Sequence, residues 1–230
     1  EEERASAEAS TPAGPPRINV YEYFDQIDRL LALGSAARAA GVLDKTRGLT
    51  LADEEKGIQL YYEGELAWRR GAFEQAAGYY HQAAKLIQER FRHSAALMRL
   101  AEFYGRHGNV SLAKSYARQS ADLLSDQAWK FKQAAGFFMG LKQTETAVAY
   151  YKRALSIDPA PIRNRDTFMG LAEAYKLWND EGNYHQYARL YLEAASAPKV
   201  KLTAAEEGML YFYRAELSGP ANKAAAYQDY

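Results

Sequence analysis

Apolar residues recur at intervals of three and four from Ile18 onward, with polar residues between them. This spacing places apolar side chains on one face of a helix, so it predicts a succession of amphipathic α-helices. The sequence has no alternating stretch of Val, Ile and Thr and no Asn-Gly hairpin turn, which are the usual signals of strands. We therefore predict an all-α protein.

Residues 1–17 depart from this pattern, because they are rich in Glu, Ala, Ser and Pro and have almost no large apolar side chains. Such a segment buries too little apolar surface to offset the entropy lost on ordering. We predict a disordered leader over residues 1–17 and a helical domain over residues 18–230. Because the first residue is Glu1 rather than Met, we expect a processed protein or a fragment whose signal or anchor has been removed.

Glycines recur through the helical part with a period of 37 residues, at Gly34, Gly71, Gly108, Gly182 and Gly219. The step from Gly108 to Gly182 is twice this period, so we predict one unit without its glycine, near residue 145. A fixed period of this length is typical of stacked structural repeats. The residues five positions after the glycines are Ala39, Ala76, Ala113, Tyr187 and Ala224, and Ala147 belongs to the unit without a glycine.

Small and aromatic residues inside the units indicate how two helices of one unit would pack. A small residue midway along the first helix, such as Gly64 or Ala101, lets the second helix approach closely. Aromatic residues of the second helix, such as Tyr80 and Tyr151, would fill the space against the neighbouring unit. The glycine between the two helices permits a tight turn, because it adopts a left-handed backbone without steric cost.

These spaced small, aromatic and Ala positions, with a closing Pro159, resemble the tetratricopeptide repeat family over roughly residues 20–228. The resemblance implies a right-handed superhelix of five to six antiparallel helix pairs. The units would start near residues 20, 57, 94, 128, 165 and 202, and the first and last are degenerate. The unit near 165 matches after an insertion of about one helical turn around residues 178–180. The period exceeds the family's usual length of about 34, which predicts some helices one turn longer.

The composition excludes several kinds of chemical site. There is no cysteine, which rules out disulfides, cysteine-ligated metals and thiol nucleophiles. The four histidines lie in no metal-binding helical spacing, and there is no nucleophile elbow or phosphate-binding glycine loop. No apolar run approaches the roughly 18 residues of a spanning helix. We expect a non-catalytic chain without cofactor, metal or membrane span, although a membrane anchor upstream of it would fit the leader.

The first helix of each pair lines the concave groove of such a solenoid, and the repeat register assigns the groove residues. Aromatic, Met and Arg side chains are frequent among them, as is usual at binding surfaces. The predicted groove residues are Tyr61, Tyr62, Glu65, Trp68, Arg69, Met98, Arg99, Glu102, Arg106, Trp129, Lys132, Gln133, Met139, Asp166, Met169, Glu173 and Lys176. Burial between helices is the preferred interpretation for Tyr80, Tyr151 and Tyr191, and an equally good one for Trp68 and Trp129.

The charges balance overall, with 29 Lys and Arg against 29 Asp and Glu, but residues 81–153 carry 12 basic and 5 acidic side chains. This basic centre favours an acidic partner, or it is simply a solvated convex face. The excess is too small for nucleic-acid binding. One subset of the family clamps C-terminal carboxylates with Lys and Asn. The corresponding positions here are Tyr61, Glu65 and Arg99, so we do not expect that clamp.

Three functions remain open on the sequence alone. The first is a scaffold that binds a protein or peptide in the groove, as part of a larger assembly. By family analogy, that assembly would belong to a bacterial envelope, secretion or exopolysaccharide machinery, in the periplasm or in membrane-associated cytoplasm. The second is binding of a polysaccharide on Tyr61, Tyr62, Trp68 and Trp129 as stacking platforms. The third is end-to-end self-assembly, against which the atypical terminal units argue.

Overall fold

Residues 19–198 and 200–218 are described by the computed structural model, and every regular element in these two ranges is helical. The α-helices are α1 (Val20–Ala32), α2 (Ala36–Asp44), α3 (Asp53–Arg69), α4 (Phe73–Leu86), α5 (Arg90–Arg106), α6 (Val110–Asp122), α7 (Ala128–Gly140), α8 (Thr144–Ile157), α9 (Arg165–Leu177), α10 (Glu181–Ala195) and α11 (Ala204–Leu217). A short 3-10 helix, η1 (Pro161–Asn164), precedes α9. The predicted all-α fold is confirmed.

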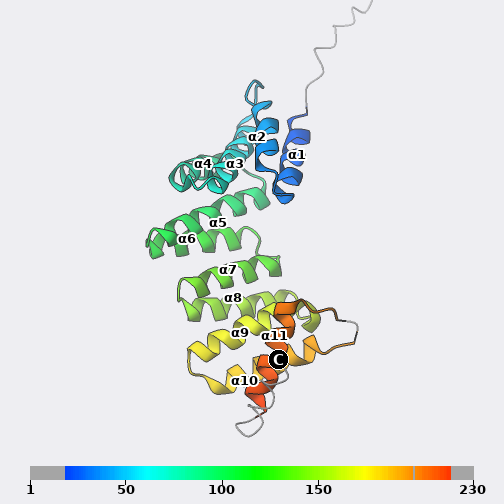
Figure 1. Cartoon of the computed structure of the whole chain (residues 1–230). Helices are drawn as coiled ribbons and strands as arrows, with labels where there is room; N and C mark the ends of the chain where they lie inside the picture. The colour runs from blue at the N-terminus through cyan, green and yellow to red at the C-terminus, as the bar shows by residue number, and fades with distance from the viewer. Residues whose placement is uncertain (1–18, 199, 219–230) are drawn as a thin grey trace, which may run out of the picture.

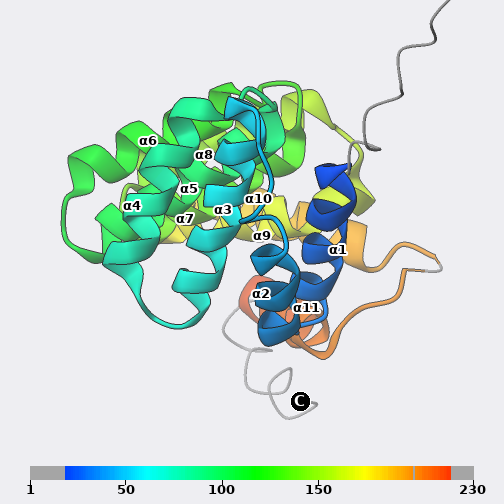
Figure 2. The same cartoon turned by 90° about the horizontal axis from the view of Figure 1, so that it is seen from above.

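The helices pack in consecutive pairs, α1 with α2 through α9 with α10, and α11 packs on α10. The pairs follow one another along a single stack, from α1 and α2 at one end to α10 and α11 at the other (Figure 1). Seen from above, α4, α6 and α8 lie toward the outside, whereas α3, α5, α7 and α9 lie closer to the centre (Figure 2). The predicted leader (1–17) and the predicted second helix of the last unit lie outside the described residues.

Every helix pair is closed by a turn of three residues, and one residue of each turn has a left-handed backbone. Glycine occupies this position in three turns, with φ of 72°, 79° and 74° at Gly34, Gly71 and Gly108. Lys142 and Asn179 occupy it in the next two, with φ of 57° and 55°. The left-handed position thus advances by 37, 37, 34 and 37 residues, which is the first departure from the sequence prediction.

The expected turn near residue 145 is wrong, because the turn is made three residues earlier by Lys142. Gly182 is not a turn residue, since it lies inside α10. The position five residues after the turn is therefore Tyr184 rather than Tyr187. The expected insertion around residues 178–180 is also wrong, because this turn is as short as the others. The additional residues of this unit lie in the longer connection of residues 158–164, which contains η1.

Glycines within the helices account for the close approach of neighbouring helices. A Cβ on Gly64 of α3 would lie 2.6 Å from the ring of Tyr80 in α4, so only glycine fits beneath that ring. Gly170 of α9 likewise lies directly against the ring of Tyr151 in α8. These two tyrosine rings thus occupy space left by glycine in a facing helix.

Candidate partner-binding surface

The predicted groove residues all lie on the first helices of their pairs, α3, α5, α7 and α9. We call the side of the stack formed by these helices and α11 the first-helix face. The exposed members are Arg69, Arg106, Trp129, Gln133, Asp166, Glu173 and Lys176. The partly buried members are Tyr61, Trp68, Arg99, Glu102, Lys132, Met139 and Met169, and the buried ones are Tyr62, Glu65 and Met98.

Two of the buried residues, Tyr62 and Met98, correct the sequence assignment. Tyr62 has no exposed surface, packs with its ring centroid 5.5 Å from that of Phe24, and donates a hydrogen bond to the Phe24 carbonyl oxygen. Met98 is 2% exposed and belongs to an apolar cluster that includes Phe131. Both side chains fill the space between successive helix pairs, so neither is available to a partner. The repeat register had assigned both side chains to the exposed side of their helices.

Glu65 is buried as well, but its carboxylate is fully engaged within the protein. Arg99 donates to both carboxylate oxygens, over 2.7 Å from Nε and 3.1 Å from a terminal nitrogen, and the Tyr80 hydroxyl donates over 2.8 Å. Burial and the charge of Glu65 raise the pKa of Tyr80, which keeps this donor protonated. Arg99 also pairs with Glu102 over 2.9 Å. This cluster links α3 to α5 and leaves little free charge there.

Trp68 and Trp129, for which burial and exposure were equally good predictions, differ in the structure. Trp68 is partly buried between two guanidinium groups, with Arg99 and Arg106 5.3 and 5.1 Å from its ring centroid, and it packs on Phe73. Trp129 is 50% exposed on α7. Its neighbour Lys130 is only 2% exposed and donates to the Gln133 side-chain oxygen over 2.8 Å, and burial lowers the pKa of this lysine to about 8.

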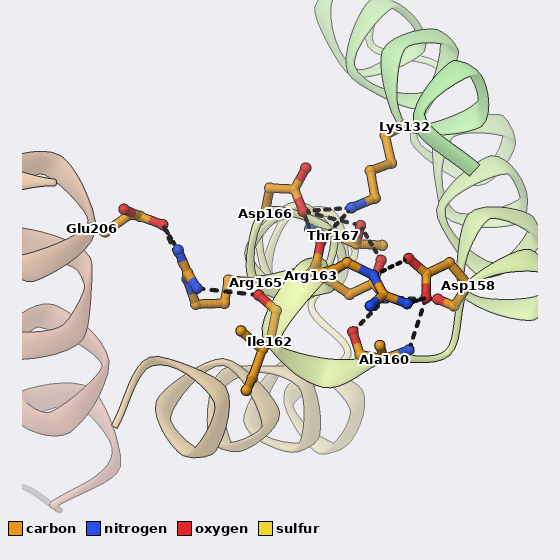
Figure 3. A network of polar contacts seen from close by, with 10 residues as sticks. Lys132, Asp158, Ala160, Ile162, Arg163, Arg165, Asp166, Thr167 and Glu206 are labelled. Carbon is orange, nitrogen blue, oxygen red and sulfur yellow. Dashed lines mark hydrogen bonds and ion pairs between the residues drawn. The ribbon is translucent and has the colours of Figure 1, made fainter. Parts of the chain in front are cut away.

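Ion pairs connect the first helices of the later units (Figure 3). Lys132 of α7 donates to Asp166 of α9 over 2.9 Å and to the Arg163 carbonyl oxygen over 2.7 Å. Arg165, at the start of α9, pairs with Glu206 of α11 over 2.8 Å. The helices α7, α9 and α11 are therefore linked in succession by cations that already have a carboxylate, and these cations offer little to an acidic ligand.

An apolar pocket of about 570 Å³ opens on the first-helix face where α9, α10 and α11 meet. It brings together three groove residues assigned from the sequence, namely Met169, Glu173 and Lys176, with residues that the sequence analysis missed. The residues missed are Tyr184, Ala205, Glu206, Met209, Phe212 and Tyr213. Ala205, Met209 and Phe212 follow one another at helical spacing, which is the signal that could have found this lining.

Two charged side chains at this pocket differ in how they are held. The Lys176 ammonium lies 4.9 Å from the ring centroid of Phe212 and 3.8 Å from a carboxylate oxygen of Glu216. Glu173 is exposed and makes no ion pair or hydrogen bond within residues 19–198 and 200–218. The pocket therefore combines an apolar interior with one exposed carboxylate that forms no direct ion pair within the described residues.

Metal clusters and membrane-spanning helices were searched for in the described part of the chain. Its His, Asp and Glu residues form no cluster of three or more that could hold a metal ion. None of its helices is both long enough and apolar enough to pass through a bilayer.

Comparison with known proteins gives the fold and no closer relationship. No model of a protein family matches the sequence, and no curated protein matches it significantly. Among solved structures, BtubC from P. vanneervenii is similar with a TM-score of 0.61 and 16% identity, over 80% of this chain and 85% of BtubC. MamA from Desulfovibrio magneticus RS-1 is similar with a TM-score of 0.59 and 17% identity, over 79% of this chain and 97% of that one.

A third similar structure is YrrB, described as a TPR protein with an unusual peptide-binding site. It has a TM-score of 0.55 and 14% identity, over 75% of this chain and 84% of YrrB. These similarities support the tetratricopeptide-like α-solenoid that the repeat positions imply.

Proposed function

We propose that this protein is a non-catalytic scaffold that binds a protein or peptide segment on its first-helix face, with an apolar side chain of the partner in the pocket between α9, α10 and α11. The observation that carries the proposal is the pocket itself. Its volume of about 570 Å³ is in the usual range of ligand pockets. Its lining of methionines and aromatic rings suits an apolar anchor, because such side chains bury large area at low entropic cost.

The charge beside the pocket specifies the partner further. Glu173 forms no direct ion pair within the described residues, so a Lys or Arg of the partner, close to the apolar anchor, would complement it. The partner expected at this face is therefore an apolar residue flanked by a basic one. The acidic partner expected from the basic centre of the sequence stays a prediction for another surface.

The alternatives predicted from the sequence have weaker support on this face. Of the four aromatic platforms expected to bind a polysaccharide, Tyr62 is buried and Trp68 is covered by two arginines. The larger assembly, the compartment and end-to-end self-association remain proposals that rest on family analogy.

Selection of peptides from a random display library on the immobilised protein would test the pocket. We expect the selected peptides to share a large apolar residue next to Lys or Arg. Their affinity should fall at least tenfold in Ala205→Leu, since Ala205 is exposed at the pocket and a leucine would fill it.

Ala204→Leu is the matched control. It adds the same side chain one residue earlier on α11, at an exposed position that does not line the pocket. The selected peptides should bind this variant as they bind the unmodified protein. Equal binding to both variants, or selection of peptides without a shared apolar residue, would show that the pocket is not the binding site.

A further inference from the structure

A second depression lies on the opposite helices of the stack, between α6 and α8, and its character is basic. It has a volume of about 700 Å³ and is lined by Lys114, Arg118 and Lys142, with Trp178 at its side. An adjoining depression of about 650 Å³ shares Lys114 and Arg118 with it. Both α6 and α8 are second helices of consecutive pairs, so this surface is separate from the first-helix face.

The cations of this depression lack the partners that the cations of the first-helix face possess. Within residues 19–198 and 200–218, Arg118 and Lys142 form no ion pair, and Lys114 donates to the neutral side-chain oxygen of Gln143 over 2.8 Å. The larger depression contains one carboxylate, Glu145, and the adjoining one contains Asp122. Three positive charges thus face at most two negative ones, and none of the three is neutralised by direct contact.

Lys142 is present here at a cost to its own backbone. It has a left-handed conformation with φ of 57°, whereas the first three turns have glycine at this position. A lysine in this conformation carries a strain that glycine avoids, and residues in strained conformations are enriched at functional sites. What lysine adds to glycine is an exposed ammonium at the rim of the depression.

Trp178 adds an apolar contact to the charged surface. The side chain is 46% exposed and comes from the turn between α9 and α10, one unit further along the stack. Thr144, Thr146 and Gln143 line the same depression with polar groups. An exposed indole beside three cations suits a chain that carries both carboxylates and an apolar side chain.

We propose that the depression between α6 and α8 binds an acidic segment of a partner protein, with carboxylates at Lys114, Arg118 and Lys142 and an apolar residue against Trp178. An extended chain can lie along the depression between the two helices and bring its carboxylates to all three cations. The protein would then bind two partners, or two segments of one partner, on opposite sides of the stack.

Fluorescence titration with a synthetic peptide of alternating Glu and Ser and one central Leu provides the test, with a Lys and Ser peptide as comparison. At low ionic strength the acidic peptide should bind saturably and change the fluorescence of Trp178, and this change should be absent from Trp178→Phe. Lys142→Gly and Arg118→Gln should each weaken binding about fivefold, with loss of affinity as salt rises. The glycine variant should remain folded, because glycine occupies this turn position elsewhere.

Arg38→Gln is the matched control, since it removes one exposed positive charge from α2 at the far end of the stack. It should leave the affinity for the acidic peptide unchanged. Equal weakening by Arg38→Gln and Lys142→Gly would overturn the proposal, because it would mean that net charge alone drives binding. Tighter binding of phosphatidylserine vesicles or of homopolymeric RNA, with the same dependence on Lys142, would also overturn it. Neither result affects the pocket between α9 and α11, which Ala205→Leu tests separately.

Discussion

Two parts of the first-helix face, at α3 and α5 and at α9 and α11, follow the same repeat pattern but differ in what they leave open. At α3 and α5, the Glu65 carboxylate is bound by Arg99 and Tyr80, and Trp68 is stacked between arginines. At α9 and α11, methionine and aromatic side chains surround a pocket, with Glu173 at its side. Equivalent positions in a repeat therefore close the surface in one unit and leave a pocket open in another.

The largest effect expected from this comparison is the loss of a buried charge in the closed part of the face. Glu65→Gln should lower the free energy of unfolding by about 2–3 kcal/mol, because Arg99 loses its two-point partner in a partly buried site. Urea unfolding followed by circular dichroism measures this change. Glu173→Gln, the matched substitution in the open part, should change stability by less than about 0.5 kcal/mol. Similar decreases in the free energy of unfolding of both variants would contradict the distinction between a closed and an open part of the face.

A second prediction concerns Lys130, which lies on α7 between the two parts. Burial lowers its pKa to about 8, below the usual value of about 10.4 in an unfolded chain. Between these values the unfolded state holds more protons, so the stability of the protein should rise as pH increases from about 8 to 10. Below pH 8 the lysine is charged in the folded protein, and burying this charge lowers the free energy of unfolding by its full amount. Lys130→Met should then stabilise the fold by about 2 kcal/mol.

This advantage of Lys130→Met should shrink as pH rises from about 8 to 10, and it should be lost at higher pH, where the lysine is neutral in both states. Thermal or urea unfolding at several pH values measures the two curves. A constant difference between variant and unmodified protein across this range would mean that packing, rather than charge, sets the effect.

The smallest expected effect concerns the turns inside the two later pairs, which have Lys142 and Asn179 where the earlier pairs have glycine. Lys142→Gly should stabilise the fold by about 0.5–1 kcal/mol, because relief of the left-handed strain exceeds the entropy that glycine adds to the unfolded chain. Asn179→Gly should gain less, since asparagine adopts this conformation more readily. Differential scanning calorimetry of the two variants provides the measurement, and an equal gain in both would contradict the strain assigned to Lys142.

The sequence predicted the helix pairs because small residues, tyrosines and turn glycines leave a direct pattern. The pattern gave wrong predictions where a residue other than glycine occupies the left-handed turn position. Lys142 and Asn179 make turns without a glycine, and Gly182 happens to preserve the period while lying inside a helix. The register of α10 was therefore shifted by three residues, and Tyr184 was missed as the residue equivalent to the alanines of earlier units.

The candidate site was less predictable, because exposure depends on neighbours far away in the sequence. Nothing local distinguishes Tyr62, which is covered by Phe24, from Tyr61 beside it. The pocket needed Met209 and Phe212 of α11, a helix whose unit matches the repeat too poorly for groove positions to be assigned. Whether a side chain is exposed to a partner depends on the packing between units. The patterns in a single sequence describe mainly the packing within each unit.

The constant length of the turns inside the pairs has a consequence for how the molecule can be altered. Each pair closes over three residues, while the connections from one pair to the next range from three residues at 87–89 to eight at 45–52. Residues can therefore be added or removed between pairs without disturbing the pairs themselves. The segment at 158–164, with its own short helix, is a longer connection of this kind between two pairs that pack directly on each other.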